Sequence, residues 1–212
     1  MAIRVITCVG DAVAPHLDDL ARLRISVFAA YPYLYAGDLD YERDYLAAYA
    51  ASRRSVFVLA LDGDRVIGAS SGIPLEDDVE AFQEPFLAQG VPLTDVFYFG
   101  ESVLLPAYRG HGLGHRFFDE REAHARRLGG FKWTAFCAVD RDTGDARQPP
   151  AYRPNDAFWL KRGYQRQQSM FCQIEWKESP DAAPIVHPMR FWLRRLDGQT
   201  DESARAQLAT PR

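Results

Sequence analysis

Residues 106–114, PAYRGHGLG, carry three glycines that alternate with other residues between an apolar run and a helix-like segment. Gly110, Gly112 and Gly114 allow the backbone to approach a ligand closely and to adopt a positive φ. A helix beginning there would direct its unpaired N–H groups and the positive end of its dipole at the loop. Arg109 adds a permanent cation. The loop therefore favours an anion such as a pyrophosphate, although a close-packed helix entry would use the same glycines.

Two familiar phosphate-binding motifs do not describe this loop. A P-loop requires GxxxxGK[ST], and the sequence contains no Gly-Lys-Ser or Gly-Lys-Thr. A dinucleotide-binding fingerprint requires GxGxxG, but His115 or Phe117 stands where the third glycine would have to be. The glycines therefore indicate neither of these nucleotide-binding classes.

A carboxylate and two histidines nearby could also do chemistry. Glu101 lies within the apolar run VFYFGESVLL, where it is either a catalytic base or a hydrogen-bonded strand residue. His111 and His115 have the i, i+4 spacing of metal ligands, but no third ligand accompanies them. No metal site is therefore predicted, and Cys137 in a later apolar run is expected to be a core residue.

An aromatic and acidic stretch is the candidate for binding a second substrate. Tyr31, Tyr33 and Tyr35 alternate with other residues and precede Asp38. Aromatic faces and a carboxylate together suit a cationic amine. Aromatic packing and an acidic helix cap would use the same residue types, and this alternative is favoured because acids belong at helix starts.

The elements that must position these residues follow from apolar periodicity and turn signals. Strands are expected at 3–9, in a hairpin over 55–75, and at 96–105, 132–139 and 167–177. Helices are expected at 15–30, 40–52, 112–129 and 156–164, with a short helix within 76–95 and a packed piece at 189–196. This order predicts an α/β protein with a mixed sheet and helices on both faces.

Composition restricts the class of protein. The 212 residues are 47% hydrophobic, which is typical of a folded domain, here predicted to span 1–196 and to end in a flexible tail at 197–212. The net charge of −4 gives no basis for nucleic-acid binding. No apolar stretch suits a membrane span or a signal peptide, and the three cysteines form no paired pattern. A cytoplasmic protein without nucleic-acid or membrane partners is expected.

Two segments resemble the GNAT superfamily of acyl-CoA N-acyltransferases. Residues 109–114, Arg109-Gly110-His111-Gly112-Leu113-Gly114, match the (R/Q)-x-x-G-x-(G/A) signature of that family. Residues 155–164, NDAFWLKRGY, are similar to its N-x-A-x-x-F-Y-x-K-x-G-F segment, shortened at the start. The element order agrees over 3–177. The resemblance implies a single domain with a GNAT-like, mostly antiparallel sheet, whose strands 96–105 and 132–139 splay apart.

The resemblance also implies where acetyl-CoA, as co-substrate, would bind. Backbone groups at Val103 and Leu104 would hold the pantetheine arm like an added strand, and the amides of 109–114 would hold the pyrophosphate. The other side of the arm would be flanked by Asn155, Phe158 and Trp159. Glu101 would be the base for the amine, and an N–H near Leu104 would stabilise the oxyanion.

One position departs from the family pattern. Trp159 stands where relatives often carry the tyrosine that protonates the leaving thiolate, and an indole is no proton source near neutral pH. Tyr152 and Tyr164 are substitutes by residue type only, and Tyr164 matches an aromatic core position. Water could serve instead.

The activity implied is transfer of an acyl group to a primary amine of a small molecule by direct attack. The alternatives are a non-catalytic acyl-CoA-binding or sensing module and an acetyltransferase for protein lysines or N-terminal amines. A homodimer would be common in this family.

Overall fold

The computed structural model describes residues 3–142 and 144–196, so the tail expected at 197–212 lies outside the described residues. The strands are β1 (Arg4–Val9), β2 (Val56–Asp62), β3 (Arg65–Pro74), β4 (Val96–Tyr98), β5 (Ser102–Leu104), β6 (Trp133–Val139), β7 (Gln165–Trp176) and β8 (Ile185–Arg195). The helices are α1 (Leu17–Phe28), α2 (Leu39–Ala51), α3 (Glu80–Ala88), α4 (Leu113–Leu128) and α5 (Asp156–Lys161). Every expected helix is present, and the sheet differs from the expected one at two places.

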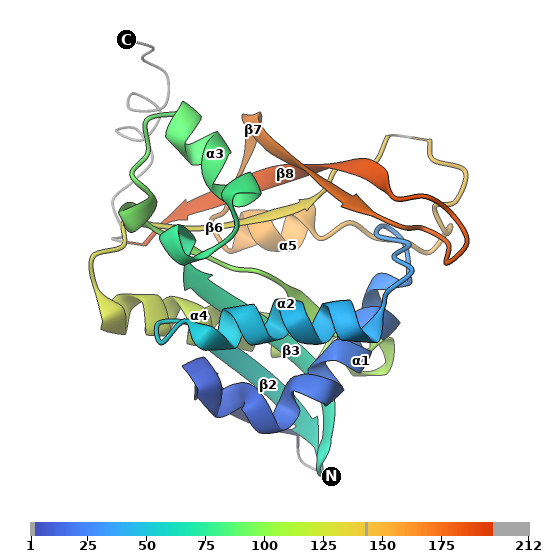
Figure 1. The fold of residues 1–212 in the computed structure, drawn as a ribbon, viewed down its shortest axis with the longest axis horizontal. Helices are drawn as coiled ribbons and strands as arrows, with labels where there is room; N and C mark the ends of the chain where they lie inside the picture. Colours follow the sequence, from blue (N-terminus) through green and yellow to red (C-terminus); the bar gives the residue numbers. More distant parts are fainter. Residues whose placement is uncertain (1–2, 143, 197–212) are drawn as a thin grey trace.

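The strands form one mixed sheet with helices on both faces, as the sequence predicts. Their order is β1-β2-β3-β4-β6-β8-β7, with β5 paired to β3. The pairing of β4 with β6 is parallel, and the other pairings are antiparallel. Helices α1 and α2 lie in front of the sheet in Figure 1, and α4 and α5 lie behind it. One buried cluster accordingly includes Leu20 and Leu46 under α1 and α2, and another includes Phe117 and Phe118 of α4.

The segment expected as one strand at 96–105 is broken into β4 and β5. The Phe99 N–H still donates to Ala135 of β6 at 2.7 Å, whereas the next N–H, that of Gly100, donates to Ser71 of β3 at 3.2 Å. The chain therefore changes partner strand at Gly100. A Cβ at this position would lie 2.6 Å from Ser71 Oγ and 2.8 Å from the Tyr49 hydroxyl oxygen, so the break has room only for glycine. Beyond it, β5 and β6 separate, which is the predicted splay.

The second difference is β8, because the expected last strand was 167–177 and 189–196 was expected only to pack on the body. Ile185–Arg195 instead forms a full strand between β6 and β7, bonded on both sides. Its inward positions alternate and are almost fully buried: His187, Met189, Phe191 and Leu193. Pro188 and the intervening arginines obscure this alternation in the sequence.

Within the described part of the chain, no helix has the length and apolar character needed to cross a membrane.

Candidate functional site

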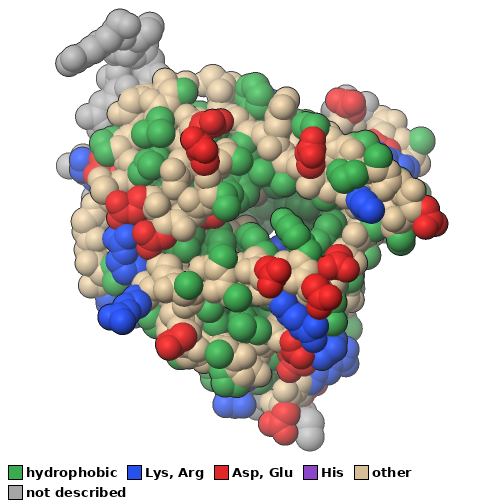
Figure 2. Space-filling model, in the orientation of Figure 1, with side chains coloured by type: hydrophobic (Ala, Val, Ile, Leu, Met, Phe, Trp, Pro, Cys, Tyr) green, Lys and Arg blue, Asp and Glu red, His purple; other side chains and the backbone are tan. Residues whose placement is uncertain are grey.

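A cleft of about 800 Å³ opens where β5 and β6 separate. Figure 2 shows its mouth as a hollow between α2 and the strands above it, with hydrophobic side chains inside. Its lining includes many of the residues singled out from the sequence: Tyr31, Tyr33, Glu101, Leu104, Arg109, Gly110, Gly112, Gly114, Asn155, Phe158 and Trp159. The structure therefore brings the glycine loop, Glu101 and part of the aromatic stretch into one cavity.

The glycine loop has the geometry of an anion site. Gly110 and Gly112 have φ of +85° and +79°, and a Cβ on either would meet no heavy atom within 4 Å. Gly112 caps α4 without any side-chain hydrogen bond to the first turn. The amides of residues 110–115 donate to no acceptor among the described residues. Open space and unpartnered N–H groups at a helix start suit phosphate oxygens.

Arg109 and α5 complete this end of the cleft. The Arg109 Nε donates to the carbonyl of Leu104 at 3.3 Å, and its guanidinium has no carboxylate partner in the described part of the chain. The ring of Phe158 on α5 lies 3.5 Å from the place a Cβ would take at Gly114, so the starts of α4 and α5 pack together. Asn155 lies at the start of α5, while the side chain of His111 is exposed outside the lining.

The backbone along the gap corrects one expected contact. In antiparallel pairing, alternate residues direct their N–H and C=O groups to the partner strand. The Leu105 N–H donates to Ile67 and the Glu101 C=O accepts from Ser71, so Val103 between them also faces β3. Its side chain is fully buried. The groups that face the gap are therefore those of Ser102 and Leu104, and Val103 lies behind them.

Glu101 lies at the break and is held by a buried arginine from α1. The Arg24 guanidinium donates to Glu101 Oε2 at 2.5 Å and to Glu42 Oε2 on α2. Glu101 is 7% exposed, and its other oxygen, Oε1, has no partner among the described residues yet is not buried, so it reaches the cleft. The predicted base thus presents one oxygen to the cavity while the other is fixed.

The three groups carry a net charge of −1 when both carboxylates are ionised. Burial alone would lower the pKa of Arg24, but the carboxylates of Glu101 and Glu42, together with Tyr45, raise it overall. Arg24 therefore stays charged. Arg24 carried no signal in the sequence, because it stands at an ordinary position of an amphipathic helix, whereas Glu42 belongs to the acidic run that follows the tyrosines and begins at Asp38.

Arg121 on α4 holds the break from the opposite face and was also missed. Its guanidinium is 1% exposed and donates to the carbonyls of Ser71 and Glu101 at 3.1 Å each and to Ser102 Oγ at 2.8 Å. The Phe99 ring lies 4.1 Å from the guanidinium carbon. Burial lowers the pKa of Arg121 to about 10, so it remains a cation at neutral pH. Both carbonyl oxygens also accept a backbone N–H across the strand change, Ser71 from Gly100 and Glu101 from Ser71, so Arg121 is a second donor to each.

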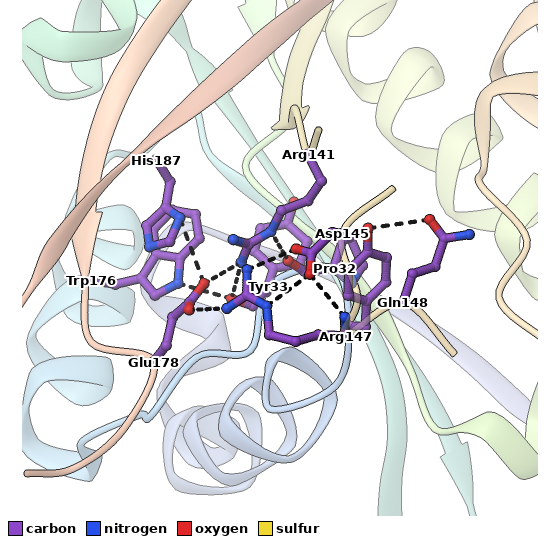
Figure 3. Close-up of polar contacts among 10 residues, drawn as sticks. Pro32, Tyr33, Arg141, Asp145, Arg147, Gln148, Trp176, Glu178 and His187 are labelled. Atoms are coloured by element: carbon purple, nitrogen blue, oxygen red, sulfur yellow. Dashed lines mark hydrogen bonds and ion pairs between the residues drawn. The ribbon is translucent and has the colours of Figure 1, made fainter. Parts of the chain in front are cut away.

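At the other end of the cleft, three distant segments meet in a polar network (Figure 3). Arg141 donates to the carbonyls of Pro32 and Tyr33 at 2.7 and 3.0 Å and to Glu178 at 2.5 Å. Arg147 pairs with the other carboxylate oxygen of Glu178. The loop before α2, the loop after β6 and the loop between β7 and β8 are thereby fixed to one another.

The aromatic stretch is divided by this arrangement. Tyr31 and Tyr33 line the cleft, and the ring of Tyr31 meets that of Tyr152 edge-on at 4.7 Å. Tyr35 and Asp38 do not line it. Asp38 Oδ1 instead accepts from the Tyr41 N–H at 2.9 Å and caps α2, as the alternative interpretation predicts.

Tyr164 is also placed away from the cavity. It is fully buried, and its hydroxyl bonds to Thr134 Oγ1 at 2.9 Å and lies 3.4 Å from Glu122. Burial raises the pKa of Tyr164 further above its usual value. This position fits the packing role and offers no path for a proton to the cleft. Trp159 does line the cleft, with its ring 5.0 Å from those of Phe136 and Trp192.

Among the described residues, no group of three or more His, Cys, Asp or Glu side chains could hold a metal ion.

Comparison with known proteins identifies the fold. The sequence matches the acetyltransferase (GNAT) family model over residues 21–148. Similar solved structures include a GNAT-family protein from Desulfovibrio desulfuricans, with 15% identity, a TM-score of 0.56, and coverage of 92% of this chain and 99% of that chain. An assigned acetyltransferase from Acinetobacter baylyi ADP1 has 14% identity, a TM-score of 0.59, and coverage of 92% and 93%.

A third similar structure contains a ligand. It is yncA from Salmonella typhimurium, an assigned acetyltransferase solved with its cofactor acetyl-CoA; it has 11% identity, a TM-score of 0.55, and coverage of 93% and 96%. At these identities the likeness concerns the fold alone. No curated protein matches the sequence significantly.

Proposed function

This chain belongs to the GNAT family of acetyltransferases, and we propose that it is an acetyl-CoA-dependent N-acetyltransferase for a primary amine of a small molecule. The observation that carries the proposal is the position of Glu101. Its free oxygen Oε1 opens into the same cleft as the glycine-loop amides and the gap-facing backbone of Leu104. A candidate base, a candidate oxyanion donor and a candidate anion site therefore border the same cavity.

The donor end of the cleft fits coenzyme A. The amides of 110–115, which have no acceptor among the described residues, and the guanidinium of Arg109 would hold the pyrophosphate. The gap-facing groups of Ser102 and Leu104 would bond the pantetheine arm as an added strand does. When bound, acetyl-CoA supplies a thioester whose acyl group an amine can accept by direct attack.

The acceptor end fits an ammonium group. The buried Arg24, Glu42 and Glu101 together carry net charge −1, and aromatic faces of Tyr31 and Tyr33 line the same end. An amine must lose a proton before it can attack, and Glu101 Oε1 is placed to receive it. The Leu104 N–H, with no strand partner, would stabilise the developing oxyanion.

No tyrosine stands at position 159 to protonate the leaving thiolate, because this residue is a tryptophan. The Trp159 ring packs between Phe136 and Trp192, and Tyr164 is buried elsewhere. Tyr152 does line the cleft, with its ring packed edge-on against Tyr31 at the acceptor end. We assign protonation of the thiolate to water. The network of Arg141, Arg147 and Glu178 lies outside the lining and fixes the loop that carries Pro32 and Tyr33, which do line the acceptor end.

The test is thiol release from acetyl-CoA during a screen of small primary amines, with Glu101→Gln as the diagnostic variant. Turnover by the variant should fall most at low pH, where the amine is protonated, while its affinity for acetyl-CoA stays unchanged. Glu84→Gln, an exposed carboxylate on α3, is the matched control. If acetyl-CoA binds but no amine or peptide accelerates thiol release, the chain is a sensing module. Acetylated peptides detected by mass analysis would instead identify a protein acetyltransferase.

A further inference from the structure

We infer that the amine accepted in this cleft carries an aromatic ring and no charge besides its ammonium group, which makes it an arylalkylamine. The inference rests on the proposed function, because it names the substrate class of that same site. It is carried by the way the sheet separates most of the charged side chains of the cleft from the aromatic ones.

The sheet gives the cleft two faces. Successive side chains of a strand point to opposite sides. On β6, Cys137 and Val139 pack in the buried cluster under α1 and α2. That cluster also contacts Phe28 and Tyr33, whereas Phe136 belongs to the cluster of α4. We call the side of α1 and α2 the acceptor face of the cleft, and the side of α4 and α5 its donor face.

The charged lining residues of β7, β8 and the end of β6 lie on the donor face. Arg166 stands directly opposite Trp192, which stands directly opposite Phe136, and opposite residues share a face. Arg190 is two residues from Trp192 on the same strand and therefore faces the same way. Asp140 pairs with Arg166 at 2.6 Å and with Arg190 at 3.0 Å, so these three charges bind one another. The glycine loop, α4 and α5 contribute further ionisable lining residues: Arg109, His115, Arg121 and Asp156.

Glu101 supplies the charge on the acceptor face. Its side chain turns toward Arg24 of α1, and its Oε1 reaches the cleft, while Arg24 and Glu42 lie outside the lining. Arg153, in the loop before α5, is exposed and donates to two carbonyls of its own loop. Among the described lining residues, Glu101 is thus the one carboxylate on this face. It matches one ammonium group, whereas a second ammonium or a carboxylate on the substrate would be buried without a counter-charge.

Aromatic rings form the rest of the acceptor face. The centroids of Phe28 and Tyr33 are 4.6 Å apart, and Tyr31 meets Tyr152 edge-on at 4.7 Å. All four residues line the cleft, and Figure 2 shows hydrophobic side chains inside its mouth. We call these four residues the aromatic wall. A substrate ring extends such offset and edge-to-face contacts, whereas the hydroxyl groups of a sugar would lose their hydrogen bonds with water.

The aromatic wall is held in place by hydrogen bonds outside the cleft. Arg141 and the Trp176 Nε1 both donate to the Tyr33 carbonyl at 3.0 Å (Figure 3). The Tyr31 hydroxyl donates to Gln148 Oε1 at 3.4 Å. Rings that are already fixed lose little freedom when a ligand binds, so their contacts contribute more fully to affinity.

The experiment measures kcat/KM for thiol release from acetyl-CoA with matched pairs of amines. Phenylethylamine should exceed phenylalanine, which differs from it by one carboxylate, at least about hundredfold. The methyl ester of phenylalanine, which lacks that charge, should recover most of the loss. Pentylamine should likewise exceed pentanediamine, which adds a second ammonium. Phenylethylamine should exceed cyclohexylethylamine, whose ring is not aromatic, about three- to tenfold.

Tyr31→Leu tests the aromatic wall, because it keeps an apolar side chain and removes the ring. The preference for phenylethylamine over cyclohexylethylamine should shrink in this variant, while the KM for acetyl-CoA stays unchanged. Tyr41→Leu is the matched control, since Tyr41 lies on α2, is 60% exposed and does not line the cleft. It should keep the full preference. Melting temperatures show that both variants are folded, and the substrate pairs test the wild type without any variant.

The two proposals can fail separately. If amines are acetylated but phenylalanine or pentanediamine reacts as fast as its matched partner, or cyclohexylethylamine as fast as phenylethylamine, the substrate class is wrong and the proposed function stands. An unchanged preference in a folded Tyr31→Leu would overturn the aromatic wall. If no amine accelerates thiol release, the proposed function fails and the substrate class fails with it.

Discussion

Replacing Gly112 by aspartate should weaken the binding of coenzyme A without unfolding the chain. Gly112 caps α4 with φ +79°, and a Cβ there would meet no heavy atom within 4 Å. The new carboxylate would therefore enter the open space that the amides of residues 110–115 face. That space is where the pyrophosphate is proposed to lie, so the substitution places a negative charge against the phosphates without a clash inside the protein.

The size of the effect follows from Coulomb's law. Two unit charges about 5 Å apart repel by about 0.8 kcal/mol in bulk water and by about 3 kcal/mol at the effective dielectric constant near a protein surface. A pyrophosphate carries more than one charge, so the Kd for coenzyme A should rise at least about tenfold, which corresponds to about 1.4 kcal/mol. Salt screens the repulsion, so the effect should shrink as ionic strength rises.

Two controls separate charge from backbone strain. Gly112→Asn has nearly the same shape as the aspartate, tolerates a positive φ and adds no charge. Gly129→Asp adds the same charge at the other end of α4, at a glycine with φ +76° and open space around it. Calorimetric Kd values and melting temperatures are compared for all three. The anion-site reasoning is refuted if Gly112→Asp binds coenzyme A no more weakly than Gly112→Asn, with both folded.

Two further predictions concern buried groups. Tyr164→Phe should keep full kcat but lower the free energy of unfolding by about 1–2 kcal/mol, because Thr134 loses its partner; a large kcat loss at unchanged stability would make Tyr164 catalytic after all. Burial, then the charge of Arg141, lowers the pKa of His187, which stacks on Trp176 at 3.6 Å. The folded state therefore resists protonation that the unfolded chain accepts, and stability should fall as pH drops below about 6.5. In His187→Phe that fall should be smaller in melting curves from pH 8 to 5, and an equal fall would show that other groups cause it.

The glycine loop could be predicted from the sequence because its signals are local. Alternating glycines, the arginine before them and the following helix all lie within a few residues of one another, and positive φ at Gly110 and Gly112 is a property of the loop itself. The break at Gly100 was harder to see. VFYFGESVLL is apolar throughout, and only the collision with Tyr49 and Ser71 from other elements shows why a glycine stands there.

The partners of Glu101 could not be predicted for a related reason. Arg24 and Glu42 lie 77 and 59 residues before it, and neither interrupts the apolar pattern of its helix. A buried ion pair is specified by tertiary packing, which brings α1, α2 and the strand break together. The strand β8 was not predicted for a local reason. Pro188 and the alternating arginines obscure its apolar alternation in the sequence, although one face of the strand is buried.

The charges at the two ends of the cleft have opposite signs, and this orients both proposed substrates. The donor end presents amides and Arg109, which has no carboxylate partner among the described residues, whereas the acceptor end presents Arg24, Glu42 and Glu101 with a net charge of −1. Phosphates would be repelled from the acceptor end and an ammonium group from the donor end.

Gly100 connects these two ends. The change of partner strand there turns Glu101 toward α1 and leaves the Leu104 backbone facing the gap. A Cβ at this residue would press on Ser71 and on the Tyr49 hydroxyl, so a larger residue there would displace the strand that carries Glu101. The base and the oxyanion donor are therefore fixed by one turn of the backbone, and a change at that turn would disturb both together.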